Sequence, residues 1–171
     1  VCVAAAAAAA ASDGVSFELI GLSGEQASYA ARMHLGEVLD AYGARHTLAR
    51  GREYDRSDVL VETTAVRDAS GVRAMAGLVF DKVEPTDPHL AAGLFTSLAE
   101  LGANVHEHAQ SVGFVAAQTV DTTGVIRFAV ADCGVGMLHT LRSRGATDSR
   151  TAIGMALSGT SRVDEATHGR G

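Results

Sequence analysis

Two polar side chains in the second half of the chain are spaced to act together. Glu100 and Asn104 lie four residues apart in segment 88–111, whose leucines recur at helical spacing, so both project from one side of a predicted helix. A carboxylate can orient water, and an amide oxygen can coordinate a hard cation. A solvated helix face is the competing interpretation. However, Asn104 is the only asparagine in the chain and stands mid-helix, where asparagine is unfavourable.

A second cluster follows a predicted strand. Residues 130–137 are VADCGVGM, so a hydrophobic run is followed by Asp132 and then by Gly134 and Gly136 at alternate positions. An aspartate can accept a hydrogen bond from an exocyclic amine such as that of adenine, and glycines let a planar base lie against the backbone. A simple turn after a strand is the alternative. A dinucleotide fingerprint needs a third glycine that is missing at the required spacing, which excludes a Rossmann site.

Two further stretches could approach phosphates. Residues 159–162 read GTSR and offer the hydroxyl of Thr160, while Gly169 and Gly171 flank an arginine. Backbone N–H groups beside glycines can cradle phosphate oxygens. Each stretch is uninformative alone, and only the order of all the clusters makes a specific pattern.

In that order the clusters resemble the GHKL ATPases, the superfamily of gyrase-type topoisomerases, heat-shock chaperones, histidine kinases and mismatch-repair ATPases. Residues 100–109 (ELGANVHEHA) resemble the N box, residues 132–137 (DCGVGM) the first glycine box, and residues 169–171 (GRG) the start of the second. The resemblance covers roughly residues 88–171. The family fold continues past its second glycine box, so the resemblance implies that this part of the domain lies outside the 171 residues.

The resemblance implies a role for each matching residue. Glu100 would be the general base that activates water, Asn104 would coordinate Mg²⁺, and Asp132 would bind the adenine amine. A mobile ATP lid would span residues 138–168. The remaining nucleotide contacts would come from Gly134, Gly136, Met137, Thr160, Gly169 and Gly171.

The function implied is a Mg²⁺-dependent ATP-binding module in which ATP hydrolysis is coupled to lid closure. One alternative is a protein kinase of the histidine-kinase or anti-sigma type, which would transfer phosphate to a protein partner. Another is a non-catalytic regulatory or scaffold module that keeps the fold. A protein partner or phosphoacceptor is therefore expected, while the oligomeric state stays open and a dimer is compatible with it.

The composition and the absence of certain motifs argue against several other classes of protein. A net charge of −6 and a pI near 5.6 argue against a broad basic face for nucleic acid. The only lysine, Lys82, precedes a valine, which excludes a P-loop. No apolar run has enough bulky side chains to span a bilayer, and two cysteines cannot form a disulfide framework. A cytoplasmic location is expected.

The candidate residues must be positioned by the helices and strands that the sequence predicts. Together these elements indicate an α/β two-layer sandwich with a mixed, mostly antiparallel sheet and helices on one face. We expect strands over 16–20, 59–66, 114–120 and 125–131, and helices over 23–42, 88–111 and 151–157. Residues 45–56 read as an exposed loop, and Ser70 and Gly71 as a break before a short apolar piece. The expected units are an alanine-rich tail (1–12), an N-terminal α/β region of unassigned role (13–84) and the ATP-binding domain (85–171).

Overall fold

The computed structural model describes residues 1–50, 59–120 and 125–158. The strands are β1 (Glu18–Leu19), β2 (Arg45–His46), β3 (Val59–Val66), β4 (Gly113–Val120) and β5 (Val125–Asp132). The α-helices are α1 (Cys2–Ser12), α2 (Gly24–Arg32), α3 (Leu35–Ala41), α4 (Ala69–Val83), α5 (Pro88–Asn104), α6 (Gly136–Leu141) and α7 (Ser149–Leu157). A π-helix, η1 (Val105–Ala109), extends α5, and a 3₁₀-helix, η2 (Arg142–Arg144), follows α6.

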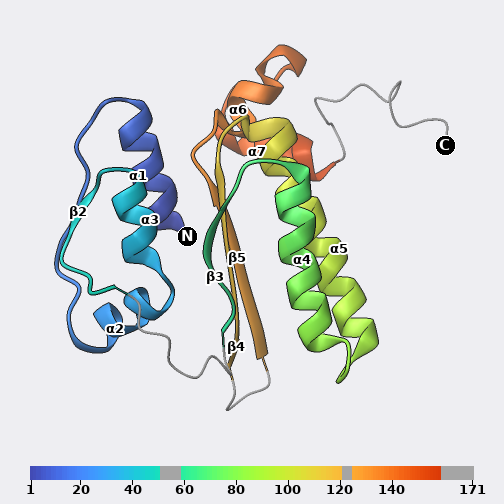
Figure 1. The fold of residues 1–171 in the computed structure, drawn as a ribbon. Coiled ribbons are helices and arrows are strands. Elements are labelled where there is room, and N and C mark those ends of the chain that lie inside the picture. The colour runs from blue at the N-terminus through green and yellow to red at the C-terminus, as the bar shows by residue number, and fades with distance from the viewer. Residues whose placement is uncertain (51–58, 121–124, 159–171) are drawn as a thin grey trace.

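An antiparallel sheet of order β3-β4-β5 forms the centre of the molecule, and β1 pairs with β2 in a small parallel sheet. Figure 1 shows α4 and α5 on one side of the central sheet and α1, α2 and α3 on the other. Helices α6 and α7 lie at one end of the sheet. The pairing of β4 with β5 is regular, whereas β3 has register shifts against β4.

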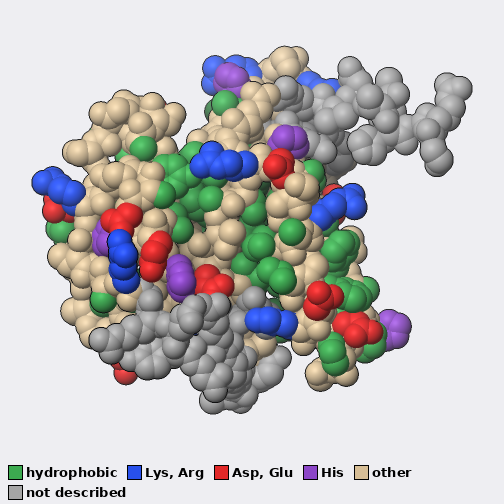
Figure 2. Space-filling model, in the orientation of Figure 1, with side chains coloured by type: hydrophobic (Ala, Val, Ile, Leu, Met, Phe, Trp, Pro, Cys, Tyr) green, Lys and Arg blue, Asp and Glu red, His purple; other side chains and the backbone are tan. Residues whose placement is uncertain are grey.

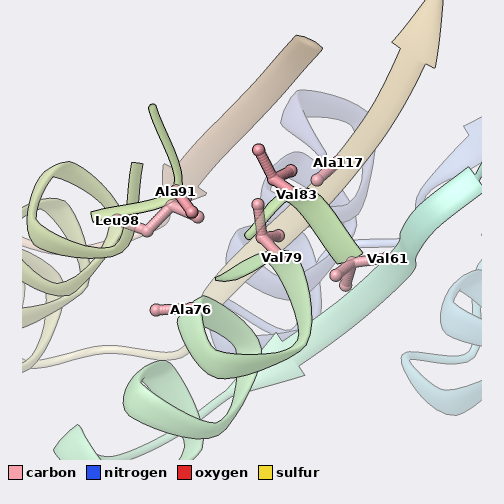
Figure 3. Close-up of a cluster of buried hydrophobic side chains, with 7 residues drawn as sticks. All are labelled: Val61, Ala76, Val79, Val83, Ala91, Leu98 and Ala117. Carbon is pink, nitrogen blue, oxygen red and sulfur yellow. The ribbon is translucent and has the colours of Figure 1, made fainter. Parts of the chain in front are cut away.

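Valine, leucine and alanine side chains form the core between the sheet and the α4–α5 pair (Figure 3). Its buried members are Val61, Ala76, Val79, Val83, Ala91, Leu98 and Ala117. Helices α4 and α5 also pack along each other and approach closely at Gly102, where an added Cβ would lie 2.1 Å from Cγ1 of Val72. This core joins residues on both sides of position 84, so the expected boundary between 13–84 and 85–171 crosses a continuous packed layer.

The opposite face of the sheet is covered by alanine. Ala4, Ala5 and Ala8 of α1 are buried against the fully buried ring of Phe114 on β4. Tyr42, which follows α3, meets this ring edge-on at 5.7 Å between centroids. Residues 1–12, expected as a tail outside the fold, therefore form a helix that packs on the sheet, because small side chains allow a close approach.

The α/β class and its mostly antiparallel sheet are confirmed. Strand β3 has the expected bounds, β4 and β5 differ from theirs by one residue at an end, and α7 lies where a short helix was expected. The second helical layer, α1 to α3, is additional to the expected arrangement with helices on one face. The turn at 121–124 lies outside the described residues.

Three local predictions are wrong. The expected helix over 23–42 is split into α2 and α3 at His34, which adopts a left-handed conformation with φ of 56°. Ser70 and Gly71 do not break the chain but lie in the first turn of α4, where the carboxylate of Asp68 accepts hydrogen bonds from both. The start of the expected loop 45–56 forms β2, and the rest beyond residue 50 lies outside the described residues.

Charged side chains of both signs are dispersed over the face seen in Figure 2. None of the helices in the described ranges is long and apolar enough to cross a bilayer.

Candidate functional site

The end of α5 carries the first two candidate residues. The helix begins at Asp87, whose Oδ1 accepts a hydrogen bond from the backbone N–H of Leu90 at 2.9 Å, and Pro88 follows this cap. Leu98 and Gly102 face inward, whereas Glu100 and Asn104 are exposed. The two polar side chains are one helical turn apart and point away from the core, as candidate ligand-binding groups must.

Asn104 is the last α-helical residue, not a mid-helix one as the sequence suggested. The π-helix η1 follows it directly, and Gln110 then turns the chain with a left-handed φ of 55°. Single π-turns in α-helices occur often at functional sites, because they displace side chains from the regular helical position. Sequence periodicity carried no sign of this turn.

Asp132 is the last residue of β5, where it pairs with Gly113 of β4. Val130 packs toward α4 and Ala131 toward α1, so strand alternation directs Asp132 to the same face as α5. Its side chain is exposed, and Oδ1 accepts a hydrogen bond from the N–H of Gly134 at 2.9 Å. An ionised carboxylate can still accept further hydrogen bonds from a ligand.

The ends of α5 and β5 meet at Gly113. A Cβ at this glycine would lie 2.7 Å from Cγ1 of Val105, so Val105 is packed directly on the backbone there. Because Val105 follows Asn104 and Gly113 is the cross-strand partner of Asp132, the backbones of the two candidate residues lie at the same end of the sheet, on the side covered by α5, while the side chain of Asn104 is exposed.

The glycines of the DCGVGM segment (residues 132–137) allow a close backbone contact and a positive φ. A Cβ at Gly134 would lie 2.2 Å from the carbonyl oxygen of Ala109, and that oxygen accepts a hydrogen bond from the N–H of Val135 at 3.2 Å. Gly136 has a φ of +72° and opens α6, with an exposed Met137 behind it. These contacts attach the start of α6 to the end of η1. Cys133, between Asp132 and Gly134, is half-buried and packs with the cluster around Phe114.

A hollow of about 300 Å³ lies where η1 ends and α6 begins. It is lined by Gln110, Val135, His139 and Thr140. None of Glu100, Asn104 and Asp132 is among these lining residues. Sequence reasoning missed Gln110, His139 and Thr140, and the only signal for the last two was their position directly after the glycine-rich segment.

The region expected as a lid is partly folded. Residues 138–158 include η2, α7 and all but the first two residues of α6, and these elements enclose a small core of Leu141, Ala146 and Ala152. Helix α7 is capped by Asp148, whose Oδ1 accepts from the N–H of Thr151 at 2.8 Å. The rest of the expected lid, together with Thr160, Gly169 and Gly171, lies outside the described residues.

The donor set suits magnesium more than a soft metal. Asn104, the residue expected to coordinate the ion, offers an amide oxygen, and oxygen ligands are those that Mg²⁺ prefers. In the described part of the chain, no group of three or more His, Cys, Asp or Glu side chains could hold a metal ion unaided.

Comparisons of the chain with protein-family models, with curated proteins and with solved structures found no match.

Proposed function

We propose that the chain is a Mg²⁺-dependent ATP-binding module of the GHKL type, with the nucleotide held between the end of α5 and the end of β5. One observation carries this proposal: Asn104 and Asp132, which are far apart in sequence, are brought to the same face and end of the sheet by the contact of Val105 with Gly113. An arrangement with these residues on opposite faces could not hold one nucleotide.

Each residue has a role that fits its position. The exposed carboxylate of Asp132 accepts a hydrogen bond from the exocyclic amine of adenine, while its bond to Gly134 fixes the carboxylate orientation. The amide oxygen of Asn104 takes one coordination position of Mg²⁺. The bound ion supplies charge neutralisation for the phosphates.

Glu100 is the residue proposed for hydrolysis. It lies one turn before Asn104 on the same exposed side of α5, so its carboxylate can accept a hydrogen bond from water beside the phosphate site. A carboxylate in this role holds the water in position and takes its proton as the attack proceeds. Water, rather than a protein side chain, is then the acceptor of the phosphoryl group.

The first experiment is a thermal-shift titration of the chain with ATP, with and without Mg²⁺. Nucleotide at 100 times its Kd stabilises a protein by about 2.7 kcal/mol, which gives a clear increase in Tm. Asp132→Asn should reduce the shift with ATP, and Asn104→Ala should remove the part of the shift that depends on Mg²⁺. Matched controls are Asp81→Asn and Ser97→Ala, which change exposed residues on α4 and on the middle of α5.

The second experiment measures released phosphate. Glu100→Ala should retain ATP binding and lose turnover, and Glu84→Ala, at an exposed position after α4, should keep both. Turnover equal to wild type in Glu100→Ala would show that Glu100 is not the base. Phosphate transfer to a protein partner with little free phosphate would indicate a kinase. No ATP-dependent shift with Mg²⁺ would overturn the proposal and favour a non-catalytic module.

A further inference from the structure

A second cavity lies on the other face of the sheet, away from the proposed nucleotide site. It has a volume of about 440 Å³ and lies between α2 and the strands β3, β4 and β5. Ala116 and Ala129 line it from neighbouring strands, at sequence positions that alternate with the side chains packed toward α4 and α5. Met33 and Leu35 line it from the ends of α2 and α3.

The cavity exists because the sheet presents alanines here. The methyl groups of Ala116 and Ala129 cannot fill the space below α2, whereas further along β4 the ring of Phe114 fills the interface with α1. The resulting volume falls within the range of about 300–1,000 Å³ that is typical of small-molecule sites. It suits a small organic molecule and is too small for a helix or strand of a partner.

The chemistry of the wall selects for an uncharged ligand. No side chain that lines this cavity in the described part of the chain is charged, and most are aliphatic; among these lining residues only Val1 carries a charge, through its α-amino group. The polar groups are few: Gln26, Tyr29, Thr63 and Gln118. Thr63 is 6% exposed and is the only buried polar residue among those the structure describes. Polar groups this sparse fix orientation rather than bind a charge.

The polar groups favour a ligand that accepts a hydrogen bond. The hydroxyl of Tyr29 donates to Oε1 of Gln118 at 2.8 Å, and this bond holds the amide of Gln118 with its carbonyl oxygen toward Tyr29. The amide N–H₂ group of Gln118 and the hydroxyl of Thr63 can each donate to a ligand. Thr63 is held in place because its backbone N–H donates to the carbonyl of Met33 at 3.0 Å.

We propose that this cavity binds a small, uncharged, mainly apolar organic molecule that carries a hydrogen-bond acceptor such as a ketone, ester or amide carbonyl. The apolar part lies on the alanines of β4 and β5 and beside Met33. The carbonyl oxygen accepts from Gln118 or Thr63. This site is independent of the proposed ATP site, because Asp132 and Asn104 are directed to the other face of the sheet.

The probe is prodan, a neutral naphthalene ketone whose fluorescence emission moves to shorter wavelength in apolar surroundings. The chain is titrated with prodan without nucleotide, so a failure of the proposed function does not affect the result. Wild type should give a saturable blue shift with one probe per chain. Ala116→Leu and Ala129→Phe place bulk in the cavity and should weaken binding at least about tenfold.

The matched control is Ala65→Phe, an exposed alanine of β3 that does not line the cavity, and its affinity should equal that of wild type. Thr63→Val keeps the shape of the side chain and removes the hydroxyl, so it should weaken prodan about two- to tenfold if that hydroxyl donates to the ketone. Tyr29→Phe removes the hydroxyl that orients Gln118 and tests the second donor in the same way. Loss of affinity in at least one of these two variants supports the hydrogen-bonding part of the proposal.

Circular dichroism and thermal melting confirm that each variant is folded. If Ala116→Leu fails to fold, Ala129→Phe decides the result, because Ala129 is exposed at the cavity rim and tolerates a larger side chain. No saturable blue shift in wild type would overturn the proposal, as would an unchanged affinity in the folded cavity-filling variants. Equal binding in both Thr63→Val and Tyr29→Phe would contradict the proposed acceptor.

Discussion

The two faces of the central sheet are built from different side chains. Toward α4 and α5 the sheet contributes Val61, Val115 and Val130, which interdigitate with valines and leucines of the helices. Toward α1 and α2 it contributes Phe114, the alanines Ala116 and Ala129, and the polar residues Thr63 and Gln118. The first face is filled, whereas the second is filled only beside Phe114 and hollow beneath α2.

This difference separates the two sites that we propose on this sheet. The aliphatic face fixes α5 firmly, and the polar residues at the end of that helix can therefore stand in solvent at a defined position. The alanine face allows α1 to lie close to the sheet but leaves a cavity where no large side chain enters. The aliphatic face therefore positions residues around the proposed nucleotide site, while the alanine face leaves space for a ligand between α2 and the sheet.

Among the variants that test the two faces of the sheet, Phe114→Ala should change the free energy of unfolding most. Its ring is fully buried in the cluster between α1 and the sheet, so its loss should lower the free energy of unfolding by about 3–5 kcal/mol. Urea denaturation followed by circular dichroism measures this. The control is Phe128→Ala, a half-buried ring toward α4 and α5, which should cost less. A greater loss in Phe128→Ala would show that the alanine face contributes little.

The burial of α1 can be tested within its own alanine run. Ala7 is completely buried, while the adjacent Ala6 is exposed. Ala7→Glu places a carboxylate among Leu39 and Ala44 and should cost about 2–4 kcal/mol, because a charge without a partner is transferred from water. Ala6→Glu should be close to neutral in the same denaturation experiment. Equal stabilities of the two variants would mean that α1 does not pack on the fold.

The tight approach of α4 and α5 gives a smaller effect. Gly102→Ala would bring a methyl group against Val72 and should cost about 1–3 kcal/mol. Gly93→Ala, on the same helix with nothing within 4 Å, should be neutral or stabilising by about 0.5–1 kcal/mol. The double variant Gly102→Ala, Val72→Ala should recover part of the loss, since it removes the clashing side chain. Similar losses at both glycines would contradict the close approach.

Much of the sheet and of α5 could be predicted from local sequence. The strands at 59–66, 114–120 and 125–131 are rich in β-branched residues, and Asp87 followed by Pro88 marks the start of α5. The hydrophobic run before Asp132 also predicted that this residue lies where the strand ends. These signals come from residues that are adjacent in sequence, so they can be recognised without knowledge of the tertiary contacts.

The remaining features depend on contacts that a single sequence does not display. Residues 4–11 are all alanine, so their periodicity cannot show which side of α1 is buried. The break at His34 and the turn at Gln110 both place a residue other than glycine at positive φ, where composition gives no warning. Ser70 and Gly71 resemble a turn until Asp68 is seen to cap the helix that contains them.

The smallest expected effect is the pH dependence of stability that comes from two helix caps, Asp68 before α4 and Asp148 before α7. Hydrogen bonds from Gly71 and Ser70 lower the pKa of Asp68 from its usual value of 3.8, and bonds from Thr151 lower the pKa of Asp148 in the same way. A carboxyl group whose pKa is lower in the folded state contributes stability above its unfolded pKa. That contribution is lost as pH falls through the folded value. Stability should therefore decline below about pH 3.8 as each cap is protonated.

Asp68→Asn keeps an oxygen acceptor for Gly71 but cannot titrate, so its urea midpoint should depend less on pH below 3.8 than that of wild type. Asp148→Asn makes the same change at α7, whose small core lies outside the main sheet packing. Because α4 belongs to the filled aliphatic layer, the change at Asp68 should appear in global unfolding, whereas that at Asp148 should appear first in amide exchange of α7. Identical responses in both measurements would mean that α7 unfolds together with the sheet and is not a separate local unit.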